Sequence, residues 1–185
     1  AATDKVNEIT SKIQAILDKI EAIEKLDDTN TVVDYANAEA IMKIIVEEFD
    51  KLTDAEKATT IGQKIESYRT SINEMTEKAE AYITADAAVV VDELNYTDAS
   101  RNSVTNLRTA YDALVDGWNT YANETASVSE ANLLAAEAKI AEFAKQLADA
   151  EALVEAILAK NFVPEASAAR AAETVIDYSN RAEIV

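Results

Sequence analysis

Apolar residues recur along most of this chain at alternating spacings of three and four. Such spacing lays an apolar stripe along one side of an α-helix, because the helix completes a turn about every 3.6 residues. The first stripe consists of Val6, Ile9, Ile13, Ile16, Ile20 and Ile23, widened by Leu17 and Leu26. Gly occurs twice and Pro once in 185 residues, so the residues that commonly interrupt helices are nearly absent. The pattern predicts an all-α fold of amphipathic helices joined by short polar loops.

Polar residues with capping side chains divide the stripes into six expected helices. Thr3 is the expected N-cap of the first helix, and residues 27–30 (Asp-Asp-Thr-Asn) end it and cap the second. Residues 53–56 (Thr-Asp-Ala-Glu) and 127–130 (Ser-Val-Ser-Glu) match the capping box, in which hydroxyl and glutamate satisfy each other's backbone amides. Pro164 breaks the fifth helix because it lacks a backbone donor. The expected helices cover about residues 4–26, 31–52, 54–94, 98–121, 130–162 and 165–180.

The third expected helix is the longest. Its stripe runs from Ile61 to Leu94 with no strong breaker before Asn95. At 1.5 Å per residue, this predicts roughly 60 Å of helix. Gly62 lies inside it, at a cost of about 1 kcal/mol relative to Ala that tertiary packing can override.

Three short internal matches indicate a repeated unit. The matched pairs are Phe49–Asp54 with Tyr111–Asp116, Gln14–Lys19 with Glu155–Lys160, and Val32–Asn37 with Val175–Asn180. They are consistent with a repeat of roughly 60–75 residues, in which the third helix of one bundle continues as the first helix of the next. We therefore expect an elongated rod of tandem antiparallel three-helix bundles, spectrin-like in sharing long continuous helices. The expected domains are residues 1–75, residues 76–145, and a partial third bundle of two helices at residues 146–185.

Part of the second unit resembles a known kind of repeat. The resemblance is to the FIVAR-type and related three-helix repeats of large bacterial cell-surface proteins. It covers residues 95–100 (Asn-Tyr-Thr-Asp-Ala-Ser), Val104, residues 107–114 (Leu-Arg-Thr-Ala-Tyr-Asp-Ala-Leu), 127–131 and 133–147. The Tyr-Thr-x-x-Ser start and the Ala-Tyr-Asp-Ala-Leu core carry the resemblance, and the first bundle lacks that start. The resemblance implies a secreted, usually Gram-positive, multidomain protein whose repeats are spacers or adhesive modules for host proteins or glycans.

Composition excludes several classes of function. The chain has 35 acidic and 17 basic residues, a net charge of −18, so phosphate backbones and anionic lipid surfaces should repel it. It contains neither Cys nor His, which removes thiolate chemistry, catalytic triads and HExxH zinc sites. No apolar run approaches the ~20 residues of a membrane span. We expect no enzyme activity, catalytic residue, cofactor or metal, and no nucleic-acid partner or membrane insertion.

The aromatic residues are the first candidates for a binding site. The residues in question are Tyr68, Tyr82, Tyr111, Trp118 and Tyr121. They could form a platform for stacking glycans, but all of them occupy heptad positions, which favours core packing. Trp118, beside Gly117, is the best candidate for partial exposure.

Acidic and glycosylation motifs have simpler interpretations. Asp27 and Asp28 lack the alternating ligands of a calcium loop, so a solvated cap is favoured. Glu47 and Glu48 lie on a polar helix face without a cleft that could raise a pKa. The sequons at residues 95–97 and 123–125 coincide with expected helix starts, where Asn and Thr are favoured as caps.

The leading expectation is therefore a non-enzymatic spacer or adhesive segment of a secreted cell-surface protein. It would hold another domain at a distance or present a bundle face to an extracellular protein or glycan, and its ligand-binding residues are not defined by sequence. The alternative is a structural subunit of a surface layer or filament, completed by helix packing between subunits. The start Ala1-Ala2 fits either removal of a signal peptide or a boundary within a longer chain.

Overall fold

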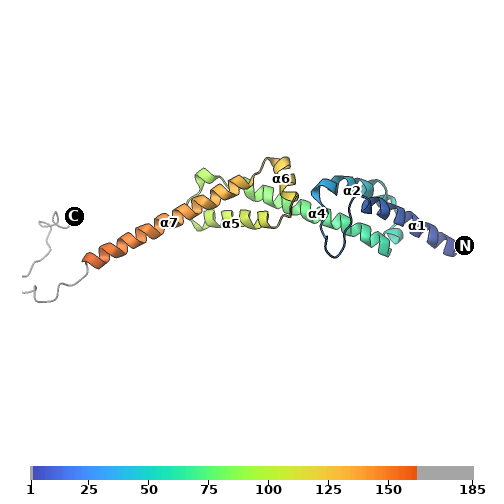
Figure 1. Cartoon of the computed structure of the whole chain (residues 1–185), viewed down its shortest axis with the longest axis horizontal. Helices are drawn as coiled ribbons and strands as arrows, with labels where there is room; N and C mark the ends of the chain where they lie inside the picture. Colours follow the sequence, from blue (N-terminus) through green and yellow to red (C-terminus); the bar gives the residue numbers. More distant parts are fainter. Residues whose placement is uncertain (1, 162–185) are drawn as a thin grey trace, which may run out of the picture. The chain divides into compact units, whose positions relative to one another are not determined.

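The computed structural model describes residues 2–161, and every regular element among them is helical (Figure 1). The all-α fold expected from the sequence is therefore confirmed for this part of the chain. The chain divides into two compact units, residues 1–141 and 142–185. The α-helices are α1 (Ala2–Glu21), α2 (Tyr35–Glu47), α3 (Asp54–Lys57), α4 (Thr60–Ala87), α5 (Asp98–Asp112), α6 (Trp118–Ala126) and α7 (Glu130–Asn161). Two 3-10 turns, η1 (Phe49–Lys51) and η2 (Val91–Glu93), lie between them.

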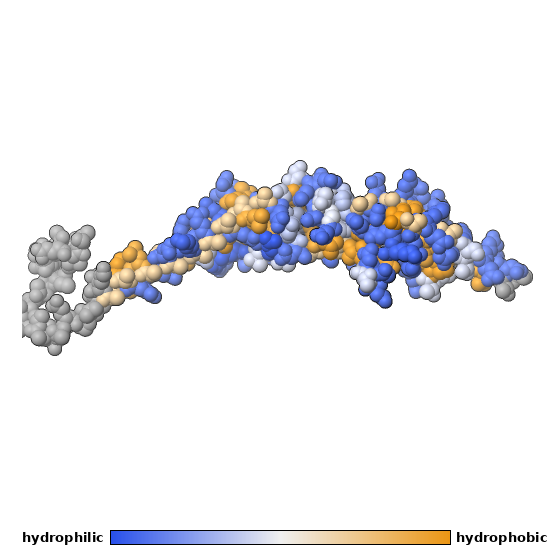
Figure 2. Space-filling view, viewed as in Figure 1, coloured by the Kyte–Doolittle hydropathy of each residue, from blue (hydrophilic) through white to orange (hydrophobic). Residues whose placement is uncertain are grey.

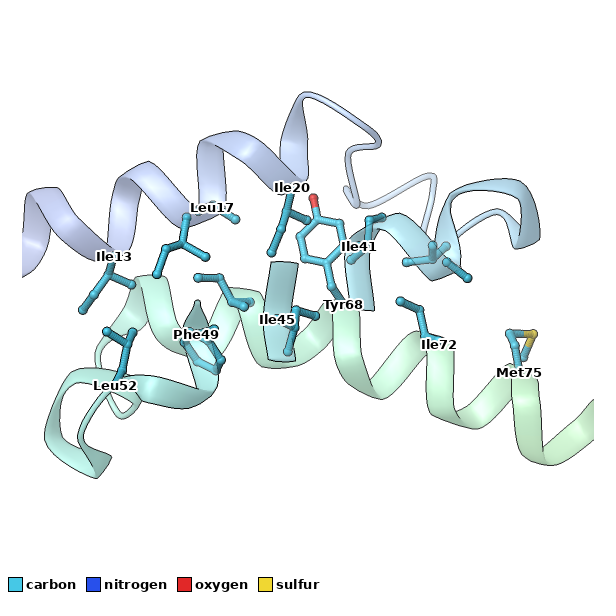
Figure 3. Close-up of a cluster of buried hydrophobic side chains, with 14 of the residues drawn as sticks. Ile13, Leu17, Ile20, Ile41, Ile45, Phe49, Leu52, Tyr68, Ile72 and Met75 are labelled. Carbon is cyan, nitrogen blue, oxygen red and sulfur yellow. The ribbon is translucent and has the colours of Figure 1, made fainter. Parts of the chain in front are cut away.

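The first unit contains two hydrophobic clusters. The N-terminal cluster joins α1, α2, η1 and α4, and Figure 3 shows side chains from these elements directed into one core. Its buried members are Ile13, Ile16, Leu17, Ile20, Val33, Ala38, Ile41, Ile45, Phe49, Leu52, Ile65, Tyr68, Ile72, Met75 and Trp118. These include most of the residues that heptad spacing assigned to the interior, because apolar stripes on neighbouring helices bury one another.

The second cluster begins further along the same α4 helix. Its buried members are Ala79, Tyr82, Val89, Leu94, Val104, Leu107, Ala122, Val128, Leu133 and Ala136. They come from the end of α4, from α5, from α6, from the first turns of α7 and from the connecting segments that hold Val89, Leu94 and Val128. Helix α4 therefore supplies residues to both clusters.

The connection between the first two helices is longer than expected. α1 ends at Glu21 rather than near Leu26, and α2 begins at Tyr35 with Asp34 as its N-cap. Residues 27–30 form their own turn, and they neither end α1 nor cap α2. The Tyr68 hydroxyl holds this connection, since it accepts from the Leu26 amide at 3.0 Å and donates to the Glu24 carbonyl at 3.2 Å.

The capping box at Thr53 and Glu56 is confirmed, but the helix that it begins has only four residues. The long helix starts again with Thr59 as N-cap. Gly62 explains this second start: a Cβ atom there would lie 2.2 Å from the Lys57 carbonyl oxygen. The glycine is therefore required by the close approach of the α3 backbone, whereas the sequence indicated only a propensity cost.

The expected helices at residues 54–94 and 98–121 are both too long. α4 ends at Ala87 and is about 42 Å long rather than 60 Å. The fourth expected helix is interrupted between Asp112 and Trp118, where Gly117 adopts φ +92°. That left-handed backbone favours glycine, and it separates α5 from α6. The heptad spacing continues across this break because Leu114 and Trp118 are apolar residues that pack in the tertiary structure, although they do not lie in one continuous helix.

The predicted capping box at residues 127–130 is wrong in its register. Ser127 ends α6 in a left-handed conformation with φ 55°, and its amide donates to the Asn123 carbonyl. Ser129 instead accepts from the Ala131 amide at 3.0 Å, so it is the side chain that caps α7.

The second unit contains the C-terminal part of α7. Several large apolar side chains are exposed there: Leu147, Leu153, Val154, Ile157 and Leu158. Figure 2 shows orange surface toward the described end of this helix. The sixth expected helix, residues 165–180, lies outside the described residues.

Candidate functional site

The five sequence-selected aromatic residues are mainly core residues. Tyr68, Tyr82 and Trp118 are almost fully buried, so the predicted core packing is confirmed for them. Tyr111 and Tyr121 are half-buried. The prediction that Trp118 would be partly exposed is wrong, because its side chain is only 1% exposed. Its indole Nε1 donates to the Val33 carbonyl at 2.9 Å, which satisfies the polar end of the buried ring.

These aromatic residues do not converge on one site. Tyr82 packs edge-on against Tyr111 in the second cluster, with ring centroids 5.4 Å apart. Trp118 packs against Tyr121 at 5.6 Å, and both rings contact Tyr35. Tyr35 was not selected from the sequence, although it lies one residue after the N-cap of α2. The trio Tyr35, Trp118 and Tyr121 lines a groove.

The groove runs between α2, α4 and α6 and encloses about 690 Å³. Its floor and walls include apolar residues from all three helices, and two carboxylates, Glu39 and Glu124, also line it. The full lining is Tyr35, Ala36, Ala38, Glu39, Met42, Ile72, Thr76, Trp118, Tyr121, Glu124 and Thr125. No basic side chain is among them.

The turn before α6 positions the aromatic trio. Gly117 lies against the start of α2, where an added Cβ atom would be 3.2 Å from Asp34 Oδ1. This close approach lets Trp118 enter the N-terminal cluster, while Ala122, one turn later, enters the second cluster. The sequence signal for this turn is Asp116-Gly117, a dipeptide typical of turns.

One hydrogen bond defines the electrostatics of the groove. The Tyr35 hydroxyl donates to Glu124 Oε2 at 2.6 Å. This bond to a carboxylate is the main cause that raises the pKa of Tyr35 above its ordinary value, followed by burial and by the charge of Glu124. Tyr35 therefore stays protonated at neutral pH, and its hydroxyl remains the donor of this hydrogen bond.

The acidic turn after α1 is a local cap. Asp27 Oδ1 accepts from the Thr29 amide and hydroxyl, both at 2.7 Å, and from the Asn30 amide at 2.9 Å. These hydrogen bonds, with Thr29 first, lower the pKa of Asp27 from 3.8 to about 2. The neighbouring Asp28 side chain is exposed. Within residues 2–161, no group of three or more acidic side chains is arranged to hold a metal ion.

The other polar motifs have structural roles. Glu47 is exposed, and Glu48 pairs with Lys19 at 2.6 Å. Asn95 accepts from the Thr97 amide at 3.1 Å, at the start of α5, as the capping interpretation predicted. The second sequon is different: Asn123 lies inside α6 and not at a helix start.

None of the helices within residues 2–161 combines the length and apolar character needed to cross a bilayer. Comparisons with family models, with curated proteins and with solved structures give no match to this chain.

Proposed function

We propose that this chain is a non-enzymatic helical spacer of a secreted bacterial cell-surface protein, built from tandem antiparallel three-helix bundles. The observation that carries the proposal is that α4 supplies Ile65 to Met75 to one hydrophobic cluster and Ala79 and Tyr82 to the next. Two cores that share one uninterrupted helix cannot rotate freely about a linker. A bend between them must break backbone hydrogen bonds of α4.

A second link supports the same proposal. Trp118 belongs to the N-terminal cluster and Ala122 to the second cluster, although both lie in α6. Motion of one cluster relative to the other would therefore also pull the Trp118 indole away from the Val33 carbonyl. Two independent connections make this unit a stiff element, which is what a spacer requires.

The remaining parts of the proposal rest on charge and on resemblance. A net charge of −18 keeps neighbouring copies apart and the chain dispersed. The FIVAR-like residues 95–114 support location at the bacterial surface and a role in which a bundle face meets a host protein or glycan.

Stiffness can be measured by electron paramagnetic resonance. The chain has no Cys, so Ser11→Cys with Asn106→Cys places spin labels only at two exposed positions, one beside each cluster. We expect one narrow distance distribution. The control carries a short Gly-rich insertion after Glu77 in α4 and should give a broad distribution. A broad distribution without the insertion would overturn the spacer proposal.

The second candidate is a structural subunit of a surface layer or filament completed by helix packing between copies. It is favoured by the exposed apolar residues in the C-terminal part of α7, of which Leu153 is 62% exposed. Sedimentation velocity across a concentration series tests it. Assembly would be supported if the chain forms polymers and Leu153→Glu abolishes them. The matched change Leu134→Glu, at another exposed leucine, should leave the polymers intact. A monomer at high concentration would overturn it.

A further inference from the structure

The groove between α2, α4 and α6 combines aromatic rings with uncompensated negative charge. Tyr35 and Tyr121 are half-buried, while Glu39 and Glu124 are exposed at the same groove. We infer that this groove binds a basic peptide segment, with a lysine or arginine side chain against the two tyrosine rings and near the two carboxylates. The inference rests on the proposed function, because it names the bundle face and the chemistry of its partner.

The aromatic part of the groove fits a cation. The face of a tyrosine ring is electron-rich and attracts an ammonium or guanidinium group, more strongly where water is partly excluded. The Tyr35 hydroxyl donates a hydrogen bond to the Glu124 carboxylate, which therefore lies next to the ring. Glu39 adds a second negative charge close enough to act on Tyr35. Both effects favour a positive ligand.

The apolar part of the groove fits the neighbouring residues of a peptide. Met42 and Ile72 line it alongside the rings, and the volume of this open groove, about 690 Å³, is within the ~300–1,000 Å³ range of ligand sites. A segment with alternating basic and apolar side chains would satisfy both kinds of lining. Because no basic side chain lines the groove, no cation in the lining competes with the peptide for the two carboxylates.

A glycan fits the same groove less well. Sugar rings stack on flat, open aromatic faces, whereas these three rings are tilted by 52–68° and pack against one another at 5.4–6.1 Å. Trp118 is 1% exposed and its Nε1 is already bonded to Val33. The rings therefore pack against one another and do not form a flat surface for stacking a sugar. Glycan binding is an alternative that the experiment below tests.

The single tryptophan makes the test direct, because Trp118 contacts both tyrosines and is the only source of tryptophan fluorescence. The probe is a short tryptophan-free peptide of repeated Leu-Arg-Ser, titrated into the full chain. Its control replaces arginine by citrulline, which keeps the shape and removes the charge. We expect a saturable change in Trp118 emission with the arginine peptide and none with the citrulline peptide.

Two double variants locate the binding. Glu39→Gln with Glu124→Gln should weaken the arginine peptide about tenfold, because two attractive charges at the groove are lost. Glu77→Gln with Glu80→Gln removes the same charge from exposed positions of α4 outside the groove and should leave the affinity unchanged. Amide NMR shifts at residues 35–42 and 118–125 provide a second readout.

Three results would overturn the inference: no saturable response to the arginine peptide, an equal loss in both double variants, or a response to chitotetraose in place of the peptide. The spacer proposal is separate from all three. A narrow spin-label distance without peptide binding would keep the spacer and remove the groove ligand, whereas a broad distance would remove the spacer.

Discussion

Two nearly identical segments of this chain have opposite environments. Gln14–Lys19 in α1 and Glu155–Lys160 in α7 both contain Ala-Ile-Leu within a regular helix. Ile16 and Leu17 are each 4% exposed, whereas Ile157 and Leu158 are each 48% exposed. The same apolar pair is therefore a core element in one helix and a surface element in the other. Helix formation follows from the local sequence, but burial depends on which elements lie against the helix.

The cover over the α1 segment comes from α2 and α4. Both helices contact α1, and Ile41, Ile45 and Ile65 belong to the same buried cluster as Ile16 and Leu17. The chain between α1 and α2 is held in place by Tyr68 from α4. The difference between the two segments can be tested by three kinds of substitution. The first truncates the matched apolar side chains, the second removes the Tyr68 hydroxyl, and the third changes the acidic turn after α1.

The largest effect should come from matched truncations in the two segments. Ile16→Ala should lower the free energy of unfolding by about 2–5 kcal/mol, because it leaves a cavity among packed side chains. Ile157→Ala should change it by less than ~0.5 kcal/mol, because the side chain is half-exposed. Urea unfolding followed by far-UV circular dichroism measures both. A loss above ~1 kcal/mol at Ile157 would mean that this face is covered in solution, as the assembly candidate requires.

A smaller effect should come from the tyrosine that fastens the α1–α2 connection. Tyr68→Phe removes a hydroxyl that serves the Leu26 amide and the Glu24 carbonyl, and should cost about 1–3 kcal/mol. Tyr82→Phe is the matched control, since the Tyr82 hydroxyl is buried without a hydrogen-bond partner in the described part of the chain. Removal of that unsatisfied group should be neutral or stabilising. Equal losses in both variants would show that ring packing alone, and not the hydrogen bonds, holds the connection.

The smallest effect concerns the acidic turn that follows α1. The folded pKa of Asp27 is about 2, below its ordinary value of 3.8, so its contribution to stability is present above pH 3.8 and is lost as the pH falls toward 2. Asp27→Asn should therefore be less stable than the unmodified chain at neutral pH, and the difference should shrink across that window. Thermal unfolding at several pH values measures it. Asp28→Asn is the matched control, because Asp28 lies in the same turn but the Thr29 and Asn30 amides donate to Asp27 and not to it.

The sequence predicted the structure most successfully where a feature is local. The Thr53–Glu56 capping box and the Thr97 cap lie where the sequence placed them, because each needs only a few consecutive residues. It was least successful at helix ends that depend on distant contacts. The break at Gly117 exists because the following Trp118 enters the N-terminal cluster and bonds to Val33, 85 residues earlier in the chain.

The groove could not be predicted for the same reason. Tyr35 and Tyr121 are far apart in sequence, and each alone resembles an ordinary heptad position. Their contact, and the hydrogen bond from Tyr35 to Glu124, arise only after α6 packs against the start of α2.

The sequence by itself determined the all-α class, the apolar stripes, most core residues and the local caps, because helical periodicity and capping are properties of neighbouring residues. The tertiary structure decided where the helices end, why Gly62 and Gly117 are glycines, and which of two similar Ala-Ile-Leu segments is buried. Those outcomes depend on close approaches between distant segments, and an apolar stripe carries no information about whether another helix will cover it.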